Sequence, residues 1–245
     1  HESIDFDDVL KEAQRLGYAE SDPTADIGGW DAARKVAILA SIAYNSRVTL
    51  DDVYVEGIDK ITAEDIAAAR KLGYVIKLLG IAKEDNGAIE ARVHPVMIPT
   101  DHPLAAVNDT FNAVFVDGDV VGQTMFYGRG AGDLPTGSAI VGDICAVARD
   151  IVFGDLGQQG CTCYLNKAIK TQNDYVSKFF IRMQVEDSPG VLSSIAKIFG
   201  ENGVSIASVV QERCKRGGAA AASLIVVTHK VQEGKFLKAK QQLES

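Results

Sequence analysis

The sequence is poor in several features that would point to particular classes of protein. Its four cysteines form no set of paired C-x-x-C ligands, and no suitably spaced histidines accompany the one close pair, Cys161 and Cys163. We therefore expect no metal site and reduced thiols. No apolar run approaches the roughly 20 residues that span a bilayer, and no basic segment leads into a short apolar one at the start. We predict a cytoplasmic protein without a membrane segment.

Positive charge is also scarce. The 245 residues include 25 Lys and Arg against 33 Asp and Glu, for a formal net charge of −8. Because binding to nucleic-acid phosphates needs a basic face, this balance disfavours nucleic acid as a partner. Hydrophobic residues make up 47% of the chain, which is ordinary for a globular protein and is sufficient for one large or two smaller domains with their own cores.

A polar, glycine-containing segment near the start is the most informative feature that is present. Residues 13–35 read AQRLGYAESDPTADIGGWDAARK. We predict that Asp31 caps a helix, because Gly28 and Gly29 precede it and apolar residues follow at helical spacing. Asp31 and Lys35 then share one side of the helix. Such a pair can tune a lysine for proton transfer, or it can be an ordinary surface pair contributing ~0.3 kcal/mol; the spacing leaves both open.

The spacings of this segment resemble the signature of homoserine dehydrogenases. A second segment, residues 127–139, resembles the glycine loop of that family near the cofactor and the helix that follows it. The matching residues of the first segment are Ala13, Gly17, Tyr18, Ala19, Glu20, Ser21, Asp22, Pro23, Asp26, Ile27, Gly29, Asp31 and Lys35.

The resemblance implies an NAD(P)-dependent oxidoreductase that interconverts L-homoserine and L-aspartate 4-semialdehyde, on the route to threonine and methionine. It implies that Glu20 and Asp26 bind the amino acid, with Glu20 at its ammonium group. Asp31 and Lys35 would then flank the reacting oxygen, since loss of hydride from an alcohol carbon requires loss of the hydroxyl proton. Tyr18 contributes to the substrate site or belongs to the core.

The glycine loop, Gly128 to Gly132 with Gly130-Ala131-Gly132 at its end, is not a complete phosphate-binding fingerprint. Asp133 stands where the third glycine would be, and its charge would repel a pyrophosphate. Beside the first motif, the loop is interpreted as a contact to the nicotinamide end of NAD or NADP. The resemblance implies that an N-terminal nucleotide-binding domain, absent from this chain, holds most of the cofactor. The chain starts at His1 and enters a helical pattern at once, so we expect a fragment with an incomplete pocket.

The sequence predicts an α+β fold with a mixed, largely antiparallel sheet covered by helices. Thr62 is the expected N-cap of a helix that Gly73 ends, and Asn86-Gly87 suits a hairpin turn. Four antiparallel strands are expected in one layer, which the family resemblance implies also helps to form a dimer. The predicted elements are a helix at 62–72 and strands at 74–82, 89–97, 111–116 and 120–126, with the second pair of strands turning at 117–119.

The last third predicts a separate unit with the order β-α-β-β-α. Its segments Val185–Leu192 and Gly200–Ile206 resemble an ACT domain, a ferredoxin-like module that binds amino acids. We expect a catalytic and dimerisation domain at 1–153, a linker at 154–176 and a truncated ACT domain at 177–245. The predicted elements are strands at 179–185, 204–210 and 220–227 and helices at 191–199 and 231–243.

Three residues of this unit are candidates for a regulatory ligand. Gly190 would let backbone amides approach a carboxylate at a helix N-terminus. Asp187 could bind an ammonium group or simply cap the helix, and Asn202 is the third candidate. Threonine is the natural effector if feedback exists, whereas the module could equally serve assembly alone.

Two functions of different classes follow. The first is the catalytic and regulatory portion of a homoserine dehydrogenase, a homo-oligomer that is inactive without its cofactor domain. The alternative is a non-catalytic amino-acid sensor or assembly module.

Overall fold

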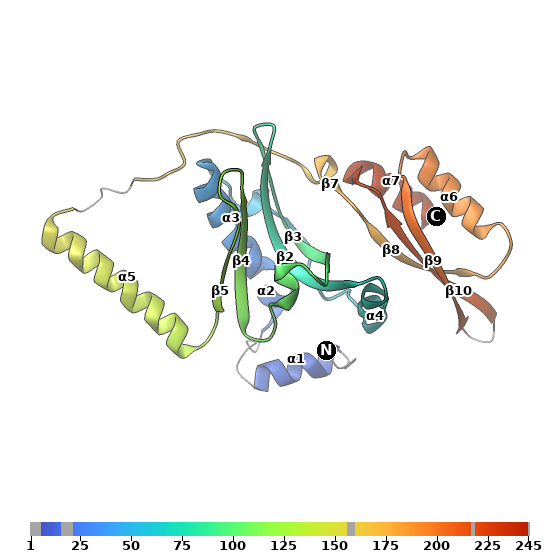
Figure 1. Ribbon diagram of the computed structural model, residues 1–245, viewed down its shortest axis with the longest axis horizontal. Helices are drawn as coiled ribbons and strands as arrows, with labels where there is room; N and C mark the ends of the chain where they lie inside the picture. The colour runs from blue at the N-terminus through green and yellow to red at the C-terminus, as the bar shows by residue number, and fades with distance from the viewer. Residues whose placement is uncertain (1–5, 16–21, 156–159, 217–218, 245) are drawn as a thin grey trace. The chain divides into compact units, whose positions relative to one another are not determined.

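The computed structural model describes residues 6–15, 22–155, 160–216 and 219–244. The chain divides into two compact units, one formed by His1–Ala82 and Arg92–Asn166 and the other by Lys83–Ala91 and Lys167–Ser245 (Figure 1). Across the described ranges, no helix is both long and apolar enough to cross a membrane.

Helix α4 of the first unit begins and ends where local sequence signals place it. In α4, Thr62 accepts a hydrogen bond from the amide of Asp65, and the Asp65 carboxylate accepts one from the amide of Thr62. Gly73 follows the helix with a positive φ of 78°. The predicted cap and end are therefore confirmed. The helices are α1 (Phe6–Arg15), α2 (Thr24–Ile27), α3 (Trp30–Tyr44), α4 (Ala63–Lys71) and α5 (Asp133–Phe153), with short 3₁₀ turns at Leu50–Asp52 and Pro103–Ala106.

The predicted hairpin around Asn86-Gly87 is confirmed. Strands β2 (Tyr74–Asp85) and β3 (Ala88–Pro99) are longer than expected, since the turn takes only two residues. Asn86 and Gly87 both have positive φ, 53° and 77°, as a type I′ turn requires. The short β1 (Tyr54–Val55) pairs in parallel with β3, giving the order β1-β3-β2.

Helix α3 packs closely against the hairpin because of one glycine. A Cβ atom at Gly80 would collide with the side chain of Val36, so glycine permits the helix to approach the strand. The small residues Ala33, Ala37 and Ala40 are buried on the same helix. This packing fixes the position of the start of α3, which carries the candidate catalytic residues.

The second predicted hairpin forms, but in a sheet of its own. Strands β4 (Phe111–Gly118) and β5 (Gly122–Arg129) pair only with each other among the described residues, so the expected single layer of four strands is wrong. The turn lies at 119–121 and not at 117–119. Gly122, with φ of 75°, starts β5 opposite Gly118 and leaves Val120 in the turn, where it is exposed.

The second unit has the predicted order β-α-β-β-α. Its sheet is antiparallel with the order β8-β10-β9. The elements are β8 (Phe180–Glu186), α6 (Val191–Glu201), β9 (Ile206–Arg216), β10 (Ala219–Thr228) and α7 (Glu233–Leu243). Three short strands and a 3₁₀ turn complete the unit: β6 (Ala168–Ile169), Gln172–Asp174, β7 (Val176–Ser177) and β11 (Val231–Gln232).

Both helices of the second unit pack on one face of this sheet. Phe199 from α6, Leu224 and Val226 from β10 and Phe236 from α7 form a buried cluster. The rings of Phe179 and Phe236 stack with their centroids 3.9 Å apart. Burial of each such side chain stabilises the fold by about 1.5–3 kcal/mol. The second unit therefore forms a hydrophobic core from its own residues.

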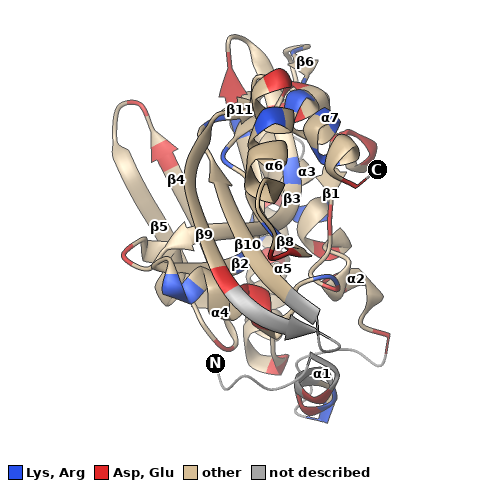
Figure 2. Cartoon of the chain, turned by 90° about the vertical axis from the view of Figure 1, so that its right-hand side faces the viewer, with Lys and Arg blue, Asp and Glu red and all other residues tan. Residues whose placement is uncertain are grey.

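Charged residues of both signs are interspersed over the elements that face the viewer in Figure 2. Acidic side chains cap several turns, among them Asp52 and Asp65. These carboxylates lie at the amide ends of helical turns, where negative charge is favourable.

Candidate functional site

The segment that leads into α3 is held by local hydrogen bonds. One oxygen of Asp22 accepts from the amide and the hydroxyl of Thr24, at 3.1 and 2.5 Å. These bonds hold the pKa of Asp22 below its usual range. The amide of Ile58 donates to the carbonyl of Ile27 at 2.9 Å. The backbone between α2 and α3 is thereby positioned by a neighbouring loop.

Gly29, and not Asp31, is the N-cap of α3. Gly29 adopts a left-handed conformation with φ of 78°, and Trp30 is the first helical residue. The prediction for Asp31 was wrong by two residues because the left-handed conformation needed to enter this helix suits glycine. Asp31 lies in the first turn, where a carboxylate still interacts favourably with the helix dipole.

Asp31 and Lys35 form the expected pair across one helical turn. The Oδ2 and Nζ atoms are 2.7 Å apart, and the side chains of Asp31 and Lys35 are 45% and 64% exposed. At such exposure the pair contributes at most about 0.5 kcal/mol to stability. It therefore matters more for positioning the amine than for holding the fold.

Asp26 precedes this pair in the chain, whereas two other candidates lie outside the described residues. Asp26 is exposed in α2, and its carbonyl accepts from the amide of Gly29 at 3.2 Å, directly before α3. Glu20 and Tyr18 lie outside the described residues. The structure thus places three of the five catalytic and substrate-binding candidates in one short stretch.

An exposed apolar surface continues from Lys35 along α3. Ile38, Leu39 and Ile42 follow at spacings of three, four and seven residues and are 61%, 46% and 58% exposed. Residues at these spacings share a helix face. The candidate site therefore borders apolar side chains that the described chain leaves in contact with solvent, a feature that the residue pattern alone did not distinguish from core.

The loop Gly130-Ala131-Gly132 connects β5 to α5 as predicted. A Cβ atom at Gly130 would meet the side chain of Asn112, so a larger residue here would have to displace that side chain. Gly132 has φ of 119° and caps α5. The loop is supported from β4 and β5, where the rings of Phe111 and Tyr127 stack at 4.8 Å.

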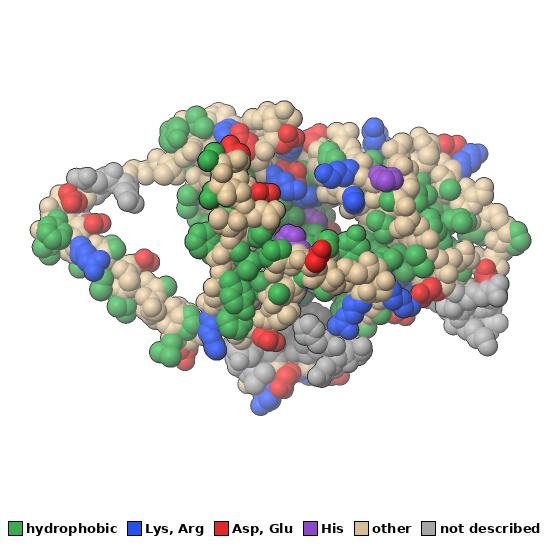
Figure 3. All heavy atoms as spheres, viewed as in Figure 1, with side chains coloured by type: hydrophobic (Ala, Val, Ile, Leu, Met, Phe, Trp, Pro, Cys, Tyr) green, Lys and Arg blue, Asp and Glu red, His purple; other side chains and the backbone are tan. Residues whose placement is uncertain are grey.

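The helix after this loop is uncovered along its length. All 21 residues of α5 are described, and none is buried. Its exposed apolar residues include Ile140, Ile144, Val147 and Ile151, which recur with helical spacing, and green side chains mark the helix in Figure 3. The sequence analysis identified a helix here but did not identify its exposed stripe.

Lys77 is a charged residue that the sequence analysis did not consider. From β2 it donates to the carbonyl of Val107 and to Oδ1 of Asn108, at 2.5 and 2.9 Å. Burial lowers its pKa, and Asp109 partly offsets this effect. Because its partners belong to the loop before β4, we assign Lys77 a positioning role for the second hairpin.

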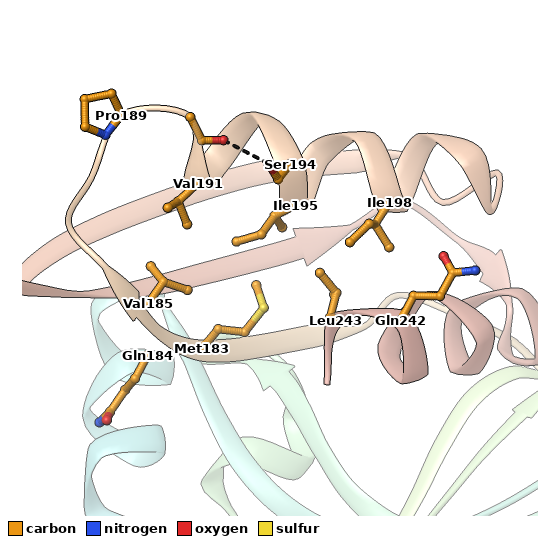
Figure 4. A pocket seen from close by; sticks show the side chains of 11 residues that line it. Met183, Gln184, Val185, Pro189, Val191, Ser194, Ile195, Ile198, Gln242 and Leu243 are labelled. Carbon is orange, nitrogen blue, oxygen red and sulfur yellow. Dashed lines mark hydrogen bonds between the residues drawn. The ribbon is translucent and has the colours of Figure 1, made fainter. Parts of the chain in front are cut away.

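A cavity of about 660 Å³ lies in the second unit between α6, β8 and the end of α7. Figure 4 shows side chains from all three elements pointing into it, while Gln184 points away. Ser194 and Gln242 add polar groups. The apolar lining consists of Met183, Val185, Val191, Ile195, Ile198 and Leu243. Their alternating and helical spacings are those of core residues, so the sequence pattern did not reveal a cavity.

The three regulatory candidates lie at different places around α6. Gly190 lines the cavity and caps α6 with φ of 97°. Asp187 accepts a hydrogen bond from Gln211 at 3.3 Å. Asn202 lies at the other end of this helix, roughly 18 Å from Gly190 at 1.5 Å per residue, where it donates to Gln242 at 2.7 Å. Only Gly190 directly lines the cavity.

Comparisons with known proteins agree with both units. The family described as homoserine dehydrogenase matches residues 1–145, and the family described as ACT domain matches residues 179–245.

The chain is 49% identical over 234 residues to the homoserine dehydrogenase of Corynebacterium glutamicum, covering 94% of this chain and 52% of that protein. It is 44% identical over 235 residues to the Bacillus subtilis enzyme, covering 96% and 54%. A crystal structure of the Thiobacillus denitrificans enzyme superposes with a TM-score of 0.90 at 39% identity, over 99% of this chain and 56% of that one. The chain spans about half the length of these relatives, and it belongs to the homoserine dehydrogenase family, with an ACT domain at its C-terminal end.

Proposed function

We propose that the protein containing this chain interconverts L-homoserine and L-aspartate 4-semialdehyde with NAD or NADP, in threonine and methionine biosynthesis. The observation that carries the proposal is the Asp31–Lys35 pair, 2.7 Å apart at the exposed start of α3. It lies in the segment whose spacings match the family. Because the chain spans about half of its relatives, we expect the 245-residue chain to be inactive alone.

In the proposed reaction Lys35 takes the hydroxyl proton of homoserine, and Asp31 either orients the amine or stabilises its charged form. NAD or NADP, when bound, accepts hydride from the alcohol carbon. A lysine acts as a base near neutral pH when desolvation lowers its pKa. The proposal therefore requires the exposed start of α3 to be covered during the reaction, and the neighbouring apolar residues Ile38 and Ile42 support such a cover.

We assign substrate binding to acidic groups that precede this pair in the chain. Asp26 is exposed and comes shortly before α3, so its carboxylate is open to homoserine. Glu20 and Tyr18 remain proposed binding residues from the family resemblance, with Glu20 at the ammonium group.

The Gly130-Ala131-Gly132 turn fits the nicotinamide end of the cofactor better than its phosphates. Asp133 lies in the first turn of α5, where its carboxylate would repel a pyrophosphate. We therefore propose that a nucleotide-binding domain N-terminal to this chain holds most of the NAD or NADP. The exposed apolar stripe of α5, which starts at this loop, supports the presence of a covering surface.

We propose that the ACT unit, residues 177–245, binds an amino-acid effector, with threonine as the first candidate and with Gly190 and Asp187 as contacts at the start of α6. Asn202, at the opposite end of α6, is a candidate contact from the sequence only and would not touch the same molecule. A cavity beside Gly190 supports a ligand at the start of α6. We also propose that residues 1–153 form a catalytic domain, which takes part in a homo-oligomer, and that residues 154–176 form a linker. The proposed location of the protein is the cytoplasm.

The test is NAD(P)-dependent oxidation of homoserine, measured in parallel on the full-length protein and on this chain, with threonine binding followed by calorimetry on both. Activity in the full-length protein alone supports the enzyme and the incomplete site. If neither oxidises homoserine while both bind threonine, the alternative of a non-catalytic sensor or assembly module is favoured. Activity in the isolated chain would contradict the proposed role of the absent domain.

A further inference from the structure

The close cysteine pair lies on a segment with a defined backbone. The amide of Tyr164 donates to the carbonyl of Thr162 at 3.0 Å, which forms a tight turn centred on Cys163. The amide of Leu165, two residues after Cys163, donates to the carbonyl of Asn45 at 2.8 Å. The turn is thus attached to the end of α3 at its C-terminal side.

This turn brings the sulfur of Cys161 back over residue 163. The amide of Cys163 donates to Sγ of Cys161 at 3.4 Å. Cys161 is exposed and Cys163 is partly buried. The sulfur of Cys161 is therefore held against the backbone of residue 163, and it is open to a reagent from solvent.

The surroundings give the two thiols different roles. Hydrogen bonds from the amide and thiol of Cys163, with the positive charge of Arg47, lower the pKa of Cys161. The hydrogen bond to Cys161, burial and the neighbouring charge raise the pKa of Cys163. The thiolate is the nucleophile in thiol–disulfide exchange, so Cys161 is the attacking group and Cys163 the resolving one.

We propose that Cys161 and Cys163 form a reversible dithiol–disulfide site that exchanges with small-molecule disulfides such as glutathione disulfide. The Cys161 thiolate attacks one sulfur of the reagent, forms a mixed disulfide and releases one glutathione thiolate. Cys163 then loses its proton to solvent and attacks Sγ of Cys161, which releases the second glutathione thiolate. The protein dithiol is oxidised by two electrons, and glutathione disulfide is reduced to two thiols.

The product should be readily reduced. A bond between residues two apart closes a small ring, and strained or exposed disulfides have more oxidising potentials than structural ones. The dithiol is therefore the resting state in a reducing compartment, and the disulfide forms when glutathione disulfide accumulates.

The test uses this chain with Cys145 and Cys214 replaced by serine, so that only the pair remains. The reduced protein is incubated with glutathione disulfide and followed by intact mass and by peptide mapping without reduction. We expect the parent pair to lose two hydrogen atoms and retain no glutathione. Cys163→Ser should retain one glutathione on Cys161, and Cys161→Ser should be modified several-fold more slowly.

Three outcomes overturn the proposal: stable glutathione on the parent pair, no reaction at all, or equal rates in the two single variants. A second measurement uses the unsubstituted chain, so that misfolding of a cysteine variant cannot affect the result. Limited alkylation of the unsubstituted, reduced chain should label Cys161 before Cys163, and Arg47→Ala should slow labelling of Cys161. Equal labelling of both thiols would contradict the assignment of roles.

Discussion

Helices α5 and α6 have similar apolar side chains and opposite environments. The 11 residues of α6 include Ile195 and Phe199, which are buried against its own sheet. The 21 residues of α5 include Ile144 and Val147, which are 61% and 54% exposed. One unit thus completes its core from its own sequence, while the described part of the other leaves an apolar helix uncovered. An exposed apolar stripe indicates that another surface covers the helix in the working protein. It does not identify that surface.

The largest effect is expected in the core of the second unit. Phe199→Ala removes a fully buried ring and should lower the free energy of unfolding of that unit by about 3–5 kcal/mol. The matched change in the first unit, Ile144→Ala on exposed α5, should stay within about 0.5 kcal/mol in this chain. Urea denaturation of both variants checks the comparison, and equal losses would show that α5 is covered in solution.

In the full-length enzyme, Lys35→Ala should lower kcat by about a hundredfold or more, because it removes the proton acceptor. Glu20→Ala should chiefly raise KM. The control is Lys197→Ala, which removes another exposed pair with the same four-residue spacing, to Glu201 on α6. If Lys35→Ala and Lys197→Ala have equal rates, the Asp31–Lys35 pair is only a surface pair.

The capping box of α4 should have an intermediate effect. Thr62→Ala removes the acceptor for the Asp65 amide and should cost about 1 kcal/mol of stability, while Thr62→Ser retains the oxygen and should cost little. Denaturation midpoints of the two variants and the parent measure this difference. A similar loss in both would mean that the methyl group, rather than the cap, is responsible.

The smallest effect concerns an exposed ion pair of the second unit. Lys170 Nζ lies 2.9 Å from Asp85 Oδ2, and this hydrogen bond with its charge lowers the pKa of Asp85. A carboxyl whose pKa is lowered by folding stabilises the fold above its unfolded pKa and loses that contribution as the pH falls through the folded pKa. Asp85→Asn should therefore reduce stability slightly at neutral pH, and this loss should shrink as the pH falls below the unfolded pKa of about 3.9. Thermal unfolding over a series of pH values tests this, and a pH-independent loss would point to packing instead.

Sequence reasoning was most accurate where neighbours in the chain determine the outcome. The Thr62–Asp65 cap, the Asn86-Gly87 turn and the pairing of Asp31 with Lys35 all involve residues at most four positions apart. The N-cap at Gly29 was missed because residue preference favoured aspartate, whereas the backbone required a left-handed residue.

By itself, the sequence determined the family motifs, the cap and end of α4, the Asn86-Gly87 turn and the β-α-β-β-α order of the second unit. Only the tertiary structure decided that the two hairpins belong to separate sheets and that α5 is uncovered while α6 buries Ile195 and Phe199. The physical reason is the range of the interactions. Caps and turns depend on hydrogen bonds within a few residues, whereas strand partners and burial depend on contacts between segments far apart in the chain.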